Sequence, residues 1–245
     1  MKKTIFSIMA LAMALVSCTN EVLTDVDGYG TIVLSVNNDE TVTRAAKAVA
    51  DLNGWIVKAN NGSEDITLTT ASTKVKAGKY TVSAKSHASE NAALTDNEGW
   101  GAAYYEGTSG EVTVTAGQPA DAVVNCGTAK NARLKVQFSL ISNFTEYSLT
   151  AERNLVFNSD NAASALAYYA ATEEVEYTLN YKYNGTPKEI TGKITMKGAA
   201  TENIISIASN DNGTISVTVN YDDTFGTGNS ENLEFDAATG DEVKK

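Results

Sequence analysis

The sequence has few of the residues that build metal, disulfide or catalytic centres. Its 245 residues include two cysteines, two prolines and a single histidine, His87. So few histidines and cysteines cannot supply clustered ligands at zinc spacing, so we expect no metal site. His87 lies in a polar stretch, residues 86–99, that we expect to be a long loop, and no nucleophile-elbow motif accompanies it. We therefore predict no catalytic residue and no cofactor.

Basic residues are also scarce, with 19 against 30 acidic ones and a net charge of −11. A chain this acidic repels nucleic acid, which excludes that class of partner.

The N-terminus has the order of a lipoprotein secretory signal. Lys2 and Lys3 give a positive start, residues 4–16 are mostly apolar, and a small residue, Ser17, precedes Cys18. The apolar run is too short to span a bilayer comfortably. We predict that residues 1–17 are a signal peptide and that Cys18 is lipidated and becomes the first residue of the mature protein.

Removal of the signal affects charge and thiol chemistry. The loss of Lys2 and Lys3 takes the basic residues from 19 to 17 against 30 acidic ones, so the net charge becomes −13. Attachment to a membrane must then come from acyl chains and not from a basic patch. Residues 18–27 are predicted to be a tether. With Cys18 acylated, Cys126 has no disulfide partner in the chain, and we expect it to be a small buried apolar side chain.

The remaining sequence is typical of an all-β protein. Short runs rich in β-branched residues recur at regular spacing with turn signals between them, which predicts a β-sandwich. Residues 177–183 alternate cleanly and run into Asn184-Gly185, a strong hairpin signal. A break near Gly127 predicts two sandwiches, residues 28–127 and 128–245. One elongated sandwich is the alternative, and no internal repeat strong enough to decide is visible.

A series of short motifs carries a resemblance to a known family. They are the sequence at residues 15–18 (LVSC), the strand that follows residues 28–30 (GYG), and residues 78–84 (GKYTVSA), 104–107 (YYEG), 123–126 (VVNC) and 131–136 (NARLKV). In this order they resemble a family of Bacteroidetes surface lipoproteins whose domain has no assigned function. More distantly, the chain is similar to the fimbrillin superfamily of pilus subunits and anchors.

The resemblance extends to about Phe157 and is weaker beyond. It implies two tandem transthyretin-like or Ig-like β-sandwich domains, and a lipid-anchored position in the outer membrane at the cell surface. It identifies no catalytic residue. In fimbrillin-type subunits a protease cuts after an arginine near the N-terminus, which makes Arg44 a candidate processing site. The alternative is that Arg44 is a solvated loop residue that is never cut.

Aromatic residues give the other candidate site. Trp100, Tyr104 and Tyr105 cluster beside the polar stretch, and Tyr168 and Tyr169 form a second pair. Aromatic faces stack on sugar rings, so the first cluster could contact glycan, although tryptophan and tyrosine also fill the edges of sandwich cores.

Three functions remain in order of preference. The first is a surface-anchored structural or adhesive lipoprotein, such as a fimbria-like subunit or accessory that contacts other surface proteins. The second is a glycan-binding outer-membrane lipoprotein of a polysaccharide uptake system. An enzyme is the third and least favoured.

Overall fold

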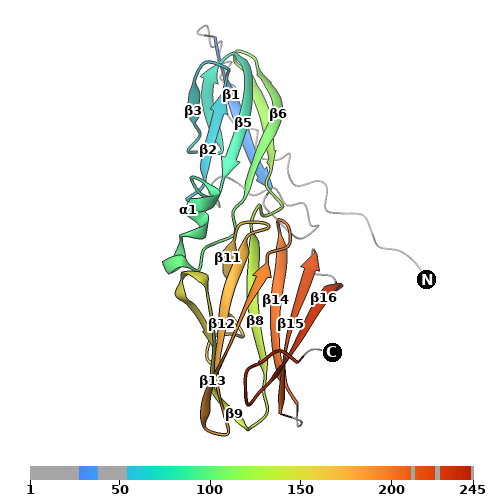
Figure 1. The fold of residues 1–245 in the computed structure, drawn as a ribbon. Coiled ribbons are helices and arrows are strands. Elements are labelled where there is room, and N and C mark those ends of the chain that lie inside the picture. Colours follow the sequence, from blue (N-terminus) through green and yellow to red (C-terminus); the bar gives the residue numbers. More distant parts are fainter. Residues whose placement is uncertain (1–27, 38–53, 211–212, 224–226, 244–245) are drawn as a thin grey trace, which may run out of the picture.

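The computed structural model describes residues 28–37, 54–210, 213–223 and 227–243. Strands dominate these residues, and helices are confined to short segments, which confirms the predicted all-β fold. The strands form two groups that lie one after the other along an elongated molecule (Figure 1).

The first group of strands builds a sandwich of two sheets. One sheet has the strand order β4-β1-β7 and the other has β3-β2-β5-β6. Alternate residues of each strand point inward, as in β1, where Ile32, Leu34 and Val36 are buried. The elements are β1 (Tyr29–Asn37), β2 (Ile56–Asn60), β3 (Asp65–Thr67), β4 (Ser72–Lys76), β5 (Gly78–Lys85), α1 (Glu90–Leu94), η2 (Asn97–Gly99), β6 (Glu106–Val114) and β7 (Pro119–Asn125).

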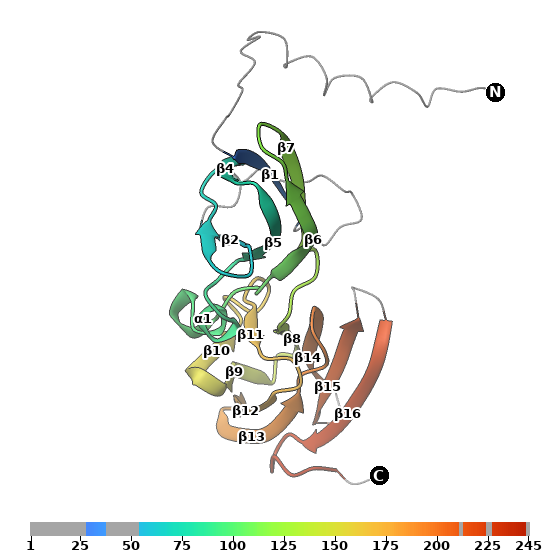
Figure 2. The same cartoon turned by 90° about the horizontal axis from the view of Figure 1, so that it is seen from above.

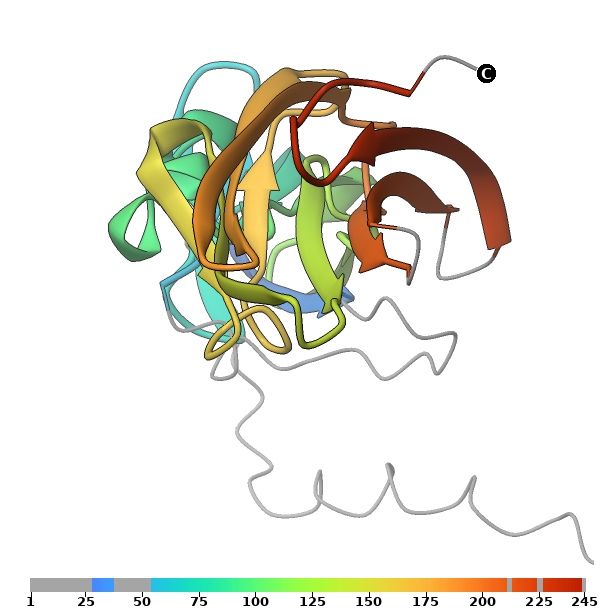
Figure 3. The ribbon, with the colours of Figure 1, turned by 60° about the horizontal axis from the view of Figure 1, so that its bottom comes forward.

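The second group also forms two sheets, with the orders β11-β8-β14-β15-β16 and β10-β9-β12-β13. Figure 3 shows β15 and β16 extending to one side of this sandwich. The elements are β8 (Ala132–Ser139), β9 (Phe144–Ala151), η3 (Glu152–Asn154), β10 (Leu155–Asn158), β11 (Ala167–Tyr169), β12 (Glu174–Tyr183), β13 (Thr186–Thr195), β14 (Thr201–Ser209), β15 (Thr214–Asp223) and β16 (Thr227–Asp236).

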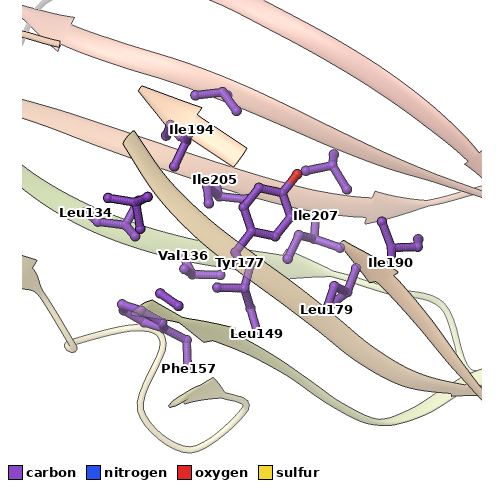
Figure 4. Packing of buried hydrophobic residues seen from close by; sticks show 14 of the residues in the cluster. Leu134, Val136, Leu149, Phe157, Tyr177, Leu179, Ile190, Ile194, Ile205 and Ile207 are labelled. Atoms are coloured by element: carbon purple, nitrogen blue, oxygen red, sulfur yellow. The ribbon is translucent and has the colours of Figure 1, made fainter. Parts of the chain in front are cut away.

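Each sandwich has its own hydrophobic core. Buried side chains between Ile32 and Cys126 form one cluster, and those between Ala132 and Ala237 form another. In the second core, side chains from both sheets meet around Tyr177 (Figure 4). Whether residues 28–127 and 128–245 fold separately stays a prediction.

The two sandwiches repeat one topology with an offset of seven strands. The order β3-β2-β5-β6 becomes β10-β9-β12-β13, and β4-β1-β7 becomes β11-β8-β14. The parallel pair of β1 with β7 recurs as the parallel pair of β8 with β14. The second sandwich then adds the β15–β16 pair beside β14. The structure therefore contains an internal repeat that the sequence pattern did not reveal.

The hairpin predicted at Asn184-Gly185 is confirmed. These two residues connect β12 to β13, and both have positive φ, 51° and 80°, as a type I′ turn requires.

Candidate functional site

The connection from β5 to β6, two strands of the first sandwich, packs against the second sandwich and forms one side of the candidate site. It was predicted to be a long loop, but it contains α1 and η2. The Ser89 hydroxyl accepts the N–H of Ala92 and caps α1, and the Asp96 carboxylate accepts the N–H of Asn97 and caps η2. Figure 2 shows α1 beside the second sandwich, near β10 and β11.

Three contacts fix this connection to the second sandwich. The N–H of Tyr168 in β11 donates to the carbonyl of Trp100 over 2.8 Å. The Trp100 ring meets the Phe157 ring edge-on, with 5.0 Å between centroids. The Arg153 guanidinium donates to the carbonyls of Leu94 in α1 and Tyr168 in β11. One arginine therefore ties α1 to the other sandwich.

Asn131 makes a further clamp at the point where the chain enters β8. Its side chain is 1% exposed, donates to the carbonyl of Ala102 over 2.8 Å, and accepts the N–H of Tyr104 over 3.0 Å. The donor and the acceptor of the buried Asn131 amide are thus both paired with backbone groups of the connection, and these two bonds fix the connection relative to β8.

Between the connection and the second sandwich lies an open hollow of about 490 Å³. Half-buried Trp100 and Tyr168 line it together with polar residues from both sides. The polar residues are Asn97, Glu98, Asn161 and Ser164. Asn97 and Glu98 have φ values of 48° and 57°, a left-handed conformation that is uncommon outside glycine and that recurs at binding sites.

The hollow combines apolar ring surface with amide, carboxylate and hydroxyl groups. This is the composition of a small-molecule site in which aromatic side chains supply contact area and a few polar groups fix orientation. A sugar ring, with apolar C–H faces and hydroxyls at its rim, matches both components. Tyr168 comes from β11, and the sequence placed it in a separate aromatic pair, so only the fold brings it to Trp100.

Tyr104 and Tyr105 lie outside this hollow. Tyr104 is 4% exposed, and its hydroxyl donates to Glu106 over 2.7 Å. Burial, followed by this hydrogen bond, raises the pKa of Tyr104 to about 12. Tyr105 stacks on Trp55 with 6.1 Å between centroids. Glycan contact through Trp100, Tyr104 and Tyr105 stays a prediction, and the geometry places Trp100 alone of the three beside the hollow.

His87 takes part in a small polar cluster that resembles a catalytic triad. Its Nδ1 lies 3.0 Å from the Ser86 hydroxyl, and its Nε2 lies 3.4 Å from the Asp96 carboxylate. However, the Ser86 oxygen accepts the N–H of Tyr105 over 2.9 Å. The Asp96 carboxylate is exposed, and its pKa is lowered mainly by the N–H of Asn97 and then by His87. A triad needs a buried acid and an available hydroxyl. This cluster instead ties the connection to the start of β6.

The two cysteines and Arg44 are the remaining residues singled out from the sequence. Cys126 is 1% exposed in the first core, and burial raises the pKa of its thiol to about 11, which confirms the predicted buried side chain. Cys18 and Arg44 lie outside the described residues. Within the described ranges, no three histidine, cysteine or acidic side chains cluster as metal ligands. Nor does any described helix have the length and apolarity to cross a membrane.

The fold and its repeat define an elongated protein of two β-sandwiches with a clamped junction. The chain belongs to the family described as a domain of unknown function, DUF4493, whose model matches residues 28–237. This match confirms the predicted membership of a family without assigned function. No curated protein matches the sequence.

The solved structures to which this chain is similar share little sequence with it. A fimbrial assembly protein from Parabacteroides distasonis has a TM-score of 0.44 and 11% identity, and the match covers 83% of this chain and 98% of the other. A protein from Bacteroides ovatus, described as a "putative cell adhesion protein", has a TM-score of 0.40 and 9% identity, with 82% and 96% of the two chains covered.

Proposed function

We propose that the protein is a lipid-anchored adhesin at the cell surface that binds glycan in the hollow lined by Trp100 and Tyr168. The observation that carries the proposal is the pairing of two half-buried aromatic side chains with four polar ones in an open hollow of about 490 Å³. The clamps formed by Arg153 and Asn131 support it, because a preorganised site loses less entropy on binding.

The test is a glycan array probed with the soluble chain that begins after Cys18. We expect selective binding to a subset of glycans. Ser164→Trp should reduce that affinity at least tenfold, because Ser164 is an exposed wall residue and an indole there fills the hollow. Glu98→Gln should weaken binding while leaving the packing unchanged.

The two tryptophans provide a matched pair of controls. Trp100→Ala should abolish glycan binding, whereas Trp55→Ala, which removes the other partly buried tryptophan, should leave it intact. Because Trp100 also packs on Phe157, each variant is first checked for an unchanged circular dichroism spectrum. No bound glycan on the array, or equal binding by Ser164→Trp, would overturn the proposal.

Anchoring by Cys18 is tested separately. Cys18→Ala should prevent incorporation of a fatty-acid analogue and release the protein from the outer membrane. A variant that still partitions fully into detergent after labelling contradicts the lipid anchor.

A fimbria-like subunit is the second candidate, favoured by the position of β1. This strand lies between β4 and β7, and Ile32, Leu34 and Val36 are buried, so its release would open a groove for a strand from another subunit. Cleavage after Arg44 would allow that release. Sequencing the N-terminus of protein recovered from its native surface tests this: a species beginning at Ala45 supports it, and lipidated Cys18 alone removes it.

A further inference from the structure

The turn that links β10 to β11 lines two hollows. Part of it belongs to the Trp100 hollow, through Asn161, Ser164 and Ala165. Another part lines a groove of about 430 Å³, through Ser159, Ala162 and Ala163. Residues 135–138 of β8 also line this groove, which we call the β8 groove. The turn is therefore a ridge that the two hollows share.

Hydrogen bonds within the turn fix the ridge. The N–H of Ala162 donates to the carbonyl of Asn158 over 3.0 Å. The N–H of Ala165 donates to the carbonyl of Asn161 over 2.8 Å, so both bonds have the four-residue spacing of a helix. The Asn161 side chain also donates to the carbonyl of Val156 over 2.8 Å and accepts the N–H of Asn158 over 2.9 Å. A ridge held in one arrangement lowers the entropic cost of binding a ligand across it.

The β8 groove has aromatic and polar side chains that remain accessible. The rings of Phe138 in β8 and Tyr147 in β9 lie with their centroids 4.9 Å apart. Both residues line the groove and are only half-buried. Gln137 and Ser159 are exposed and add an amide and a hydroxyl. Like the Trp100 hollow, the groove thus combines ring surface with a few polar groups, a composition that suits a sugar.

The two hollows carry opposite charges. Among the described residues that line them, Glu98 is the charged residue of the Trp100 hollow, and Lys135 is that of the β8 groove. The ridge itself carries Asp160, which accepts the Ser159 hydroxyl over 3.2 Å and is not part of the described lining of either hollow. Opposite charges attract and like charges repel, so the groove favours an acidic sugar and the Trp100 hollow disfavours one.

We propose that the glycan bound in the Trp100 hollow is an acidic oligosaccharide that crosses the ridge and places a sugar bearing a carboxylate in the β8 groove. This inference rests on the proposed glycan binding and names its substrate class. An uncharged sugar contacts Trp100, and the acidic sugar contacts the ring pair of the groove while its carboxylate pairs with Lys135. A helical turn with its side chains is about 10 Å across, so a single sugar cannot occupy both hollows.

Two neighbouring substitutions on the ridge separate the hollows. Ala163→Trp places an indole in the β8 groove, and Ser164→Trp places one in the Trp100 hollow, since both residues are exposed. Thr191→Trp adds the same indole to an exposed position on the sheet β10-β9-β12-β13 and is the matched control. Lys135→Met removes the charge of the groove but keeps an unbranched side chain, whereas Lys135→Arg retains the charge.

The probe is an array of uronic and sialic acid oligosaccharides of increasing length, each printed beside its carboxyl-reduced form, together with single neutral sugars. We expect the soluble chain to bind an acidic oligosaccharide at least tenfold more tightly than its reduced form and than any single sugar. Because the chain as a whole is acidic, such a preference requires a local cation. Lys135→Met should lose the preference for acid, and Lys135→Arg should keep it.

Ala163→Trp should lose the gain from length but still bind single sugars, Ser164→Trp should lose both, and Thr191→Trp should match the unaltered chain. Equal binding of acidic and reduced forms, an acid preference that persists in Lys135→Met, or an unchanged length dependence in Ala163→Trp overturns this inference. Each of these results leaves glycan binding in the Trp100 hollow standing. Binding of no glycan at all instead overturns the proposed function, and this inference with it.

Discussion

Replacing Gly192 with alanine tests how tightly the second core is packed. Gly192 in β13 lies opposite Tyr177 in β12, whose side chain is 3% exposed. A Cβ at position 192 would lie 2.4 Å from the Tyr177 hydroxyl oxygen and 2.5 Å from Cζ. Non-bonded carbons prefer about 3.5–4.0 Å, so the ring must move by about 1 Å. Figure 4 shows this ring among Ile205, Ile207 and Leu179, which limit that movement.

Overpacking of this kind typically costs about 1–3 kcal/mol. For a protein of this length, a loss of about 2 kcal/mol lowers the melting temperature by roughly 4–8 °C. Urea unfolding followed by circular dichroism measures the change. Gly110→Ala is the matched control, because a Cβ there meets nothing within 4 Å and the residue is also in a strand. We expect it to change stability by less than about 0.5 kcal/mol.

A double-mutant cycle isolates the contact. Tyr177→Leu removes the ring atoms that a Cβ at position 192 would meet, so Gly192→Ala should cost at least about 1 kcal/mol less in that background. Additive costs, or a Gly192→Ala variant as stable as Gly110→Ala, would refute the packing argument.

Three further outcomes follow from other contacts. The Tyr104 hydroxyl lowers the pKa of Glu106, so Tyr104→Phe should raise that pKa in an NMR titration and destabilise the fold by about 0.5–1 kcal/mol at neutral pH. A carboxyl group whose pKa is lowered by folding stabilises the folded state at pH values above its unfolded pKa. The difference in stability between wild type and Tyr104→Phe should therefore shrink as the pH falls through the folded pKa of Glu106. A difference that does not change with pH contradicts this account. In a Cys18→Ala chain at pH 8, Cys126 should react with Ellman's reagent only as the first sandwich opens, and immediate labelling contradicts its burial. Residues 131–245 alone should melt cooperatively, at a lower temperature than the full chain because the ring contact between Phe157 and Trp100 is absent from the fragment. A disordered fragment would favour one continuous sandwich.

Local patterns predicted the strands well because alternation is encoded residue by residue. The alternating residues 177–183 and the Asn184-Gly185 turn gave one hairpin directly. The repeat could not be predicted in this way. It rests on pairings such as β1 with β7 and β8 with β14, which join residues far apart in the chain. Strand spacing differs between the two halves, so no fixed period appears in the sequence.

The connection between β5 and β6 contains helices that the sequence could have predicted and a side-chain contact that it could not. Ser89 and Asp96 are residue types that cap the N-terminus of a helix, and their positions indicate the starts of α1 and η2. The role of Arg153 could not be found, because it donates to backbone carbonyls, which carry no residue-specific signature. Trp100 was recognised as a candidate, but its neighbour Tyr168 reaches it only through the pairing of β11 with β8.

The comparison of the two sandwiches suggests a division of roles. In the first, β6 and β7 approach so closely that a Cβ at Gly107 would lie 2.2 Å from the carbonyl oxygen of Asn125, and β4 covers β1 along its first half. In the second, β11 is shorter and pairs with β8 only as far as Leu134, and the Trp100 hollow adjoins the same strand β11. Under the proposed anchoring at Cys18, the first sandwich would be the spacer next to the membrane. The Trp100 hollow would then lie beyond that spacer, at the junction with the second sandwich.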